Sequence, residues 1–221
     1  MTVTADVLPI AVAASTPPTT PTADFWFDPI CPWAWMTSRW MGEVGKVREI
    51  RVRWHIFSLS VLNEGRELPP GYRARMDRAW GPARVVNAAA IEHGDAVIKP
   101  LYDALGTRFH PGGRGGDDER DAVLAEALAE LGLPADLARY ANADTYDAQL
   151  RASTADALAL VGDDVGVPIV AFNGTAFFGP VVTPAPKGEA AGKLWDGCLA
   201  VAQTPGFFEL KRTRTQAPMF D

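Results

Sequence analysis

The sequence predicts an α/β fold in which the two ends of the chain build a small sheet and an all-helical segment is inserted between them. Strand-like apolar segments occur only near residues 24–59 and 168–178, whereas residues 70–162 show helical periodicity without a strand signal. At 221 residues with 48% hydrophobic residues, the chain suits one domain, or one domain that carries a large insertion.

The first part of the sheet is predicted to be a βαβ unit. A strand is expected around Phe25–Phe27, followed by a helix from about Pro32 to Lys46 that has proline in its first turn. Residues 49–59 alternate and are rich in β-branched and aromatic side chains, so they are predicted to form a second, parallel strand. We expect order to begin at Asp24, after a disordered Ser-, Thr- and Pro-rich leader at residues 1–23.

The middle of the chain, residues 70–162, is rich in Ala, Leu and Arg and is predicted to hold four or five helices. The sheet domain would then comprise residues 24–69 and 163–221. Breaks between the helices are expected at Gly81-Pro82, Lys99-Pro100, His110 to Gly116 and Leu133-Pro134. The glycine-rich residues 111–116 lack the lysine-serine ending of a phosphate-binding loop and are interpreted as a mobile loop or lid hinge.

The β signal returns near the C-terminus. Residues 168–172 and 175–178 flank Asn173-Gly174, which is a strong hairpin signature. A closing helix is expected at about Gly188 to Ala202, and an irregular tail follows it. The predicted order is therefore β-α-β, helical insertion, then β-β-α.

Charge and composition exclude several classes of function. A net charge of −6 argues against a nucleic-acid partner, and the basic run Lys211 to Arg214 is interpreted as a solvated tail. No apolar run is long enough to span a bilayer, and residues 7–14 lack the basic start of a signal peptide. Two distant cysteines, Cys31 and Cys198, do not form a disulfide framework, so a reducing cytoplasmic setting is expected. No residue cluster has the spacing of a metal site.

The tetrapeptide Cys31-Pro32-Trp33-Ala34 lies where the first strand turns into the first helix. Free N–H groups and the dipole at a helix start stabilise a thiolate, so a lowered pKa and a nucleophilic role are predicted for Cys31. The motif resembles the Cys-X-X-Cys of thioredoxin-like redox proteins, except that alanine replaces the second cysteine.

Pro168 is the second element of the predicted site. In thioredoxin-like folds, a cis-proline at the start of this strand packs against the active-site cysteine, and the backbone beside it, here at Val167, pairs with an incoming thiol. The expected architecture is thus a thioredoxin-like sheet with a helical insertion, as in DsbA.

The chain resembles the DsbA-like, FrnE-related mycothiol-dependent nitroreductases of actinobacteria. The resemblance covers essentially the whole chain from Ala23 onward and is carried by residues 23–29, 37–40, 62–64, 78–82, 177–181, 192–196 and 207–215. It implies a cytosolic enzyme that uses mycothiol as co-substrate, without flavin, and whose helical subdomain closes over the thiol site. The usual active site of the family is Cys-Pro-Trp-Cys, whose first cysteine and tryptophan correspond to Cys31 and Trp33.

Three further residues are candidates for the substrate pocket. Asn63 matches a pocket residue of the family, although a turn residue that satisfies backbone groups is an equal interpretation. Tyr72 lies, like Trp80, on the first insertion helix, where ordinary helix packing competes with a pocket role. His110 precedes the glycine-rich loop and would approach the site if that loop were a lid. Tryptophans near Cys31 favour a small, flat or apolar electrophile as substrate.

Ala34 restricts the mechanisms that remain possible. In a dithiol enzyme the second cysteine resolves the mixed disulfide, which alanine cannot do. Cys198 is expected in the core of the closing helix, away from the site. The leading hypothesis is therefore a monothiol cycle in which a second low-molecular-weight thiol releases Cys31, in a monomer or homodimer.

Other hypotheses remain open from the sequence. One is a transferase or isomerase of the kappa-class type, in which mycothiol is the activated thiol. Another is a non-catalytic thiol-binding protein that kept the fold. The same sequence would also result if alanine had been introduced at position 34 to trap a mixed disulfide.

Overall fold

The computed structural model describes residues 20–116 and 118–220. Most of the predicted disordered leader falls on residues 1–19, which lie outside the described residues. The first strand begins at Thr22, two residues before the expected start, because Thr22 still pairs with Arg51 on the neighbouring strand.

Four strands form one mixed sheet in the order β2-β1-β3-β4. The strands are β1 (Thr22–Phe27), β2 (Arg51–Ile56), β3 (Ile169–Phe172) and β4 (Thr175–Phe178). β1 pairs in parallel with β2 and antiparallel with β3, so the N-terminal and C-terminal parts of the chain join at β1. The predicted hairpin is confirmed: β3 and β4 are antiparallel, and Asn173 and Gly174 both have positive φ in the turn between them.

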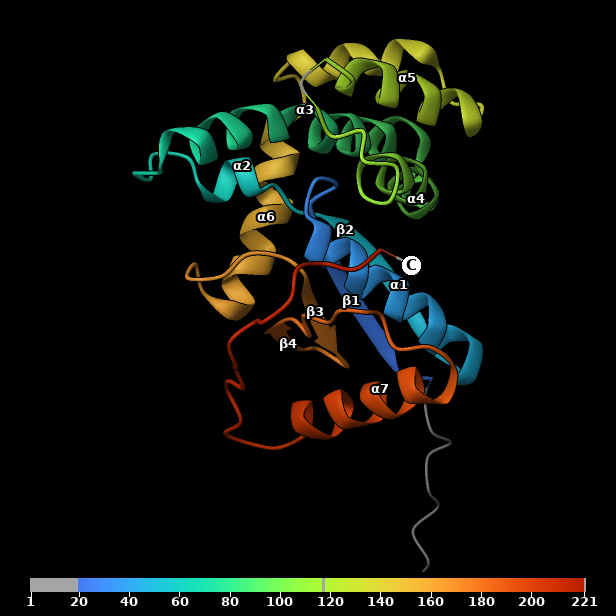
Figure 1. The fold of residues 1–221 in the computed structure, drawn as a ribbon, viewed down its shortest axis with the longest axis vertical. Coiled ribbons are helices and arrows are strands. Elements are labelled where there is room, and N and C mark those ends of the chain that lie inside the picture. Colours follow the sequence, from blue (N-terminus) through green and yellow to red (C-terminus); the bar gives the residue numbers. More distant parts are fainter. Residues whose placement is uncertain (1–19, 117, 221) are drawn as a thin grey trace, which may run out of the picture.

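Helices account for most of the remaining described residues (Figure 1). The α-helices are α1 (Pro32–Val47), α2 (Leu59–Leu62), α3 (Pro70–His93), α4 (Ile98–Phe109), α5 (Arg120–Glu130), α6 (Asp147–Val161) and α7 (Gly188–Ala202). Two 3₁₀ helices, η1 (Asp95–Val97) and η2 (Ala135–Asn142), connect members of the insertion. The described residues thus confirm strand-helix-strand, an all-helical middle and strand-strand-helix.

Three local predictions are wrong. The break expected at Lys99-Pro100 lies instead at Gly94, which ends α3, and Pro100 is part of the first turn of α4. The second strand ends at Ile56 rather than at residue 59, because Ser58 caps the short helix α2 by accepting a hydrogen bond from the Val61 N–H. The helix expected to break at Gly81-Pro82 continues through Pro82 to His93. An internal proline costs about 3 kcal/mol, but buried side chains such as Val85 and Val86 beyond it hold the helix in the core.

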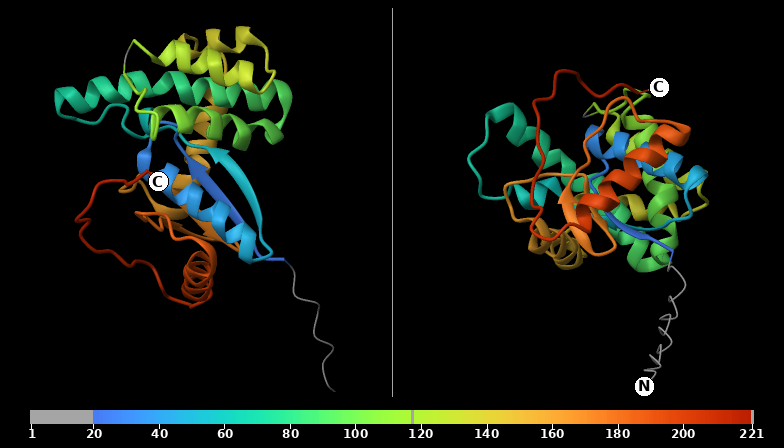
Figure 2. Two further views of the ribbon diagram at one scale, coloured as in Figure 1. Left: turned by 45° about the vertical axis from the view of Figure 1, so that its right-hand side comes forward. Right: turned by 90° about the horizontal axis from the view of Figure 1, so that it is seen from below.

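The helices place the β1–α1 turn under a helical cover. α1 and α7 pack together, where the Trp40 indole N–H donates to the Ala191 carbonyl at 3.1 Å. The insertion helices α3, α4 and α5 form a separate layer at the end of the sheet where α1 begins (Figures 1 and 2). The turn that carries Cys31 therefore lies between the sheet and the insertion.

The hydrophobic core is continuous between these two parts. Phe27 of β1 stacks on Tyr102 of α4, with ring centroids 3.8 Å apart, and both side chains are fully buried. Burial of each such side chain contributes about 1.5–3 kcal/mol, so these contacts hold the insertion firmly on the sheet. Among the described residues, no helix is long and apolar enough to cross a membrane.

Candidate active site

Cys31 is the N-cap residue of α1, as the sequence predicts. Its backbone is extended, and its carbonyl accepts the first intrahelical hydrogen bond, from the Trp35 N–H at 3.0 Å. Pro32 occupies the first helical position, where no N–H is needed. The N–H groups of Trp33 and Ala34, at the open start of the helix, act on the Cys31 sulfur and lower its pKa.

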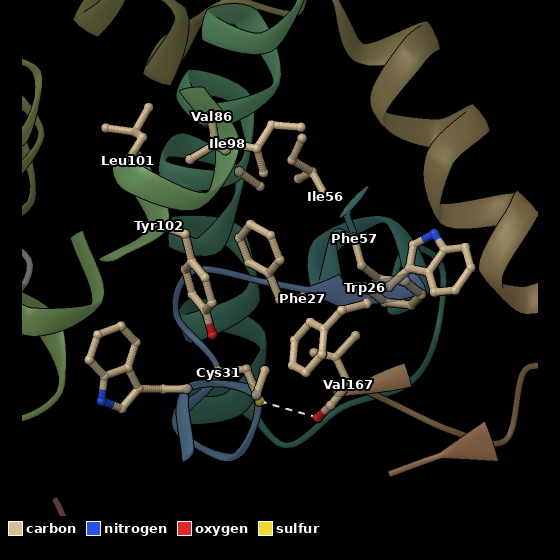
Figure 3. Close-up of a cluster of buried hydrophobic side chains, with 14 of the residues drawn as sticks. Trp26, Phe27, Cys31, Ile56, Phe57, Val86, Ile98, Leu101, Tyr102 and Val167 are labelled. Atoms are coloured by element: carbon tan, nitrogen blue, oxygen red, sulfur yellow. Dashed lines mark hydrogen bonds between the residues drawn. The ribbon is translucent and has the colours of Figure 1, made fainter. Parts of the chain in front are cut away.

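The strand that follows the insertion provides the other wall of the site. The Val167–Pro168 peptide bond is cis, and the Cys31 thiol donates a hydrogen bond to the Val167 carbonyl at 3.3 Å (Figure 3). Residues 31 and 167 are thus brought together across 136 positions of sequence. The contact stabilises the protonated thiol, because a carbonyl accepts the S–H proton and would repel a thiolate.

The predicted low pKa of Cys31 is wrong for the structure as it stands. Burial is the largest influence and raises the pKa to about 11, and the nearby Asp28 carboxyl raises it further. The N–H groups of Trp33 and Ala34 act in the opposite direction and are outweighed. Only 7% of Cys31 is exposed, so desolvation of the charged form exceeds the stabilisation at the helix start.

Asp28 is a buried acid that the sequence reasoning did not identify. It directly follows the apolar strand β1 and is fully buried. Its carboxylate accepts hydrogen bonds from the Ile30 N–H at 3.0 Å and the Leu59 N–H at 2.7 Å. Burial raises its pKa to about 7 despite these two bonds. The available signal was an ionisable residue directly after an apolar strand and three residues before Cys31.

His110 is buried against the same turn. Its Nε2 lies 3.0 Å from the Pro29 carbonyl, which accepts the ring N–H, and the ring lies 5.6 Å from that of Trp35. Burial lowers the pKa of His110 to about 4, so the ring is neutral and serves as a hydrogen-bond donor. His110 thus fastens the end of α4 to the residues that precede Cys31.

Asp28 and His110 should give opposite pH dependences of stability. The pKa of Asp28 rises from 3.8 in the unfolded chain to about 7, so the stability it contributes is lost as the pH increases from 4 to 7. The pKa of His110 falls from 6.5 to about 4, so the stability it contributes is lost as the pH decreases from 6.5 to 4. Each slope is at most about 1.4 kcal/mol per pH unit, and the two oppose each other.

We expect Asp28→Asn to gain stability relative to the wild type as the pH rises from 4 to 7. His110→Gln should show the reverse trend between pH 4 and 6.5. Urea unfolding at half-unit pH intervals measures both differences. Parallel pH curves for Asp28→Asn and the wild type would contradict the raised pKa of Asp28.

Two arginines near the turn were also missed. The guanidinium group of Arg75, on α3, donates a hydrogen bond to the Ile30 carbonyl at 3.5 Å. Its positive charge lowers the pKa of both Cys31 and Asp28. Arg214 lies over the Trp33 ring, 5.0 Å from its centroid. The C-terminal segment returns from α7 towards the start of α1 (Figure 2). Residues 211–214 are all exposed, as expected of a solvated tail, but Arg214 also covers one face of Trp33.

The other residues predicted to line the pocket make local contacts or lie on the surface. Asn63 uses its amide locally: its Nδ2 donates to the Leu59 carbonyl at 2.8 Å, which supports the interpretation as a turn residue. Tyr72 is 40% exposed on the first turn of α3. Trp80 lies against the guanidinium groups of Arg84 and Arg151, a packing position on the surface of the insertion.

Ala34, which stands where the family has a second cysteine, is fully buried within the first turn of α1.

Cys198 is partly buried on α7, and both Cys31 and Cys198 are free thiols. Burial raises the pKa of Cys198 to about 11. Within the described residues, no group of three His, Cys, Asp or Glu side chains is arranged to hold a metal ion.

A hollow of about 410 Å³ lies beside α1. Its walls include Trp35 and Arg39 of α1, Lys99 of α4 and Phe220 near the C-terminus. Arg39 stacks on Trp35, with the guanidinium carbon 3.8 Å from the ring centroid. The hollow therefore combines aromatic faces with two cationic side chains, Arg39 and Lys99, which both pair with Asp103, and it lies one helical turn away from Cys31.

Comparisons with solved structures agree with this architecture. A probable DsbA oxidoreductase, SCO1869 from Streptomyces coelicolor, is 20% identical with a TM-score of 0.53 and covers 89% of this chain and 95% of its own. DsbA from Xylella fastidiosa is 18% identical with a TM-score of 0.52 and covers 82% and 85%. The cytosolic disulfide reductase DsbM from Pseudomonas aeruginosa, solved with GSH, is 20% identical with a TM-score of 0.52 and covers 81% and 99%. These likenesses show a DsbA-like thioredoxin fold.

Sequence comparisons define the family. The uncharacterized protein Rv2286c of Mycobacterium tuberculosis is 31% identical over 201 residues, which is 89% of this chain and 84% of that protein. The family described as mycothiol-dependent nitroreductase Rv2466c matches residues 30–212, which include Cys31 and Pro168. The chain therefore belongs to the Rv2466c-like family of mycothiol-dependent nitroreductases.

Proposed function

We propose that this protein is a mycothiol-dependent thiol oxidoreductase, related to the nitroreductases, that works through the single thiol of Cys31. The observation that carries the proposal is the placement of Cys31 at the start of α1, facing the Val167 carbonyl, with Ala34 where a resolving thiol would lie. The family supports mycothiol as the thiol. Cys198 on α7 is the only other cysteine, and we propose that it has no part in turnover.

In the proposed cycle, two mycothiol molecules are oxidised to one disulfide, and one acceptor is reduced by two electrons. Cys31 thiolate bonds to the electrophilic atom of the acceptor, and one mycothiol thiolate then attacks the Cys31 sulfur. The acceptor leaves with the electron pair and takes up protons, while a Cys31–mycothiol mixed disulfide forms. A second mycothiol thiolate attacks this disulfide, releasing mycothiol disulfide and regenerating Cys31 thiolate.

Binding of the thiol would help to activate Cys31. A cysteine-derived thiol such as mycothiol carries an amide N–H, which can replace the Cys31 S–H at the Val167 carbonyl. The sulfur would then lose the contact that favours its protonated form, while the N–H groups of Trp33 and Ala34 remain directed at it. The hollow beside Trp35 has polar side chains and an aromatic face that suit the hydroxyl-rich remainder of the thiol.

The protonated resting state of Cys31 supports a second candidate function. In a transferase or isomerase of the kappa-class type, mycothiol itself would be the reacting thiol and Cys31 would only donate a hydrogen bond to it. A third candidate, thiol binding without turnover, predicts a reactive Cys31 but no turnover of any thiol-coupled substrate. The three candidates differ in whether Cys31 becomes covalently modified during turnover.

The experiment that separates them combines intact mass with a coupled assay. The protein is incubated with oxidised mycothiol, and NADPH consumption through a mycothiol-disulfide reductase reports thiol oxidation in the presence of nitroaromatic acceptors. A single mycothiol adduct on Cys31, released by excess thiol as the acceptor is consumed, supports the monothiol cycle. Turnover without any adduct would favour the transferase or isomerase, and an adduct without turnover would favour simple binding.

A further inference from the structure

The hydroxyl group of Tyr102 has no hydrogen-bond partner, although the side chain is fully buried on α4. Among the described residues, it is the only buried side-chain nitrogen or oxygen that lacks a hydrogen-bond partner. Buried polar groups in folded proteins are nearly always hydrogen-bonded, so an exception within a well-packed core calls for an explanation. A phenylalanine would fill the same space without leaving a polar atom unsatisfied.

The orientation of this hydroxyl is fixed by aromatic packing. The Tyr102 ring stacks on Phe27, at 3.8 Å between centroids, and meets the Trp35 ring edge-on at 5.7 Å. Phe27 is the last residue of β1 and Trp35 lies in the first turn of α1, so the ring is held between the two elements that flank Cys31. Figure 3 shows the hydroxyl pointing from α4 towards the turn that carries Cys31.

The surroundings of Tyr102 favour a hydrogen-bond donor. Burial raises the pKa of Tyr102 well above its ordinary value, and the charge of Cys31 raises it further, so the hydroxyl keeps its proton. The nearby Ser38 hydroxyl acts in the opposite direction and lowers the pKa of Tyr102, but the two hydroxyls do not have the geometry of a hydrogen bond. The Ser38 hydroxyl instead donates to the Trp35 carbonyl at 2.7 Å and accepts from Arg39.

We propose that Tyr102 is a catalytic residue whose hydroxyl donates a hydrogen bond to the Cys31 sulfur once that sulfur has lost its proton. In the resting protein the thiol is directed at the Val167 carbonyl, and no hydrogen bond joins its sulfur to the Tyr102 hydroxyl. Once the sulfur has lost its proton it is repelled by the Val167 carbonyl and becomes an acceptor, so a rotation of the Cys31 side chain towards α4 would supply the missing partner of Tyr102. The proposal deepens the proposed function and rests on Cys31 being the reacting thiol.

Tyr102→Phe tests this proposal because it removes only the hydroxyl oxygen. The rate of Cys31 alkylation by iodoacetamide, followed from pH 6 to 11 in a Cys198→Ser background, should fall about 10- to 100-fold below the thiol pKa. The temperature of half-unfolding should stay unchanged or rise, since an unpartnered group is removed. Tyr146→Phe makes the same chemical change where the hydroxyl donates to Glu92, and should leave alkylation unchanged.

A more acidic donor provides the opposite test. Fluorotyrosine at position 102 has nearly the size of tyrosine but donates a stronger hydrogen bond, so alkylation should become faster at a given pH. Identical alkylation profiles for the wild type, Tyr102→Phe and the fluorotyrosine protein would overturn the proposal. Alkylation reports on Cys31 without any turnover. If Tyr102→Phe altered the alkylation profile but the protein had no thiol-coupled activity, the role of Tyr102 would stand and the proposed function would be rejected.

Discussion

Replacement of Cys31 by serine is expected to abolish thiol-coupled turnover, with a loss of at least about 10³-fold in kcat/KM. Serine preserves the size of the side chain and the N-cap position, but its hydroxyl is not ionised at neutral pH and does not form disulfides. The mycothiol adduct should therefore be absent from the intact mass as well. Turnover and the adduct both depend on the Cys31 sulfur, so they should be lost together.

Cys198→Ser is the matched control, because it removes the other thiol of the chain from a partly buried site on α7. It should keep both the adduct and the turnover of the wild type. Full activity of Cys31→Ser towards an electrophile would reject the nucleophile and leave direct activation of mycothiol. An adduct that moved to Cys198 would instead reject the assignment of the reacting thiol.

Much of the fold could be predicted because local signals and tertiary contacts agree. The hairpin at Asn173-Gly174 needs positive φ at its turn, and the sequence provides two residues that tolerate it. The helix α3 was misjudged at Pro82 because the packing of Val85 and Val86 is a tertiary effect that outweighs a local breaker. The order of the strands was not predicted, since it depends on which edge of β1 receives β3.

The site was predictable in position but not in electrostatics. Cys31 lies at the helix start beside the cis Val167–Pro168 bond, as the motif indicates. The raised pKa of Cys31 arises from burial, and no local pattern reports burial by parts of the chain as distant in sequence as Val167. Asp28 and Tyr102 were missed for the same reason: each is ordinary in sequence and unusual only because it is buried next to Cys31.

The burial of Cys31 and its hydrogen bond to the Val167 carbonyl both favour the protonated thiol in the resting protein. A thiol that is protonated and covered reacts slowly with unintended electrophiles, while the N–H groups of Trp33 and Ala34 retain the capacity to stabilise a thiolate. Reactivity would then depend on a bound thiol displacing Cys31 from the Val167 carbonyl. This coupling fits the proposed active site with a single cysteine, because a thiol that reacts prematurely there has no neighbouring cysteine to release it.

Ala34→Cys is expected to convert the protein from one that holds a mycothiol adduct to one that expels it. Residues 31 and 34 lie in one helical turn, where positions three apart are neighbours. A cysteine at position 34 can attack the Cys31 sulfur within the same molecule, which corresponds to a very high effective concentration of thiol. Release of bound mycothiol at millimolar external thiol should accelerate by at least about 10³-fold.

Intact mass distinguishes the two states directly. After oxidised mycothiol is added, the wild type should carry one mycothiol, whereas Ala34→Cys should lose about 2 Da as an internal disulfide forms. Ala34→Ser enlarges the same buried position without a thiol and should keep the adduct, which separates resolution from mere crowding. A persistent adduct on Ala34→Cys would mean that the turn around Cys31 is too rigid for internal attack, and that Ala34 is not what confines the enzyme to a monothiol cycle.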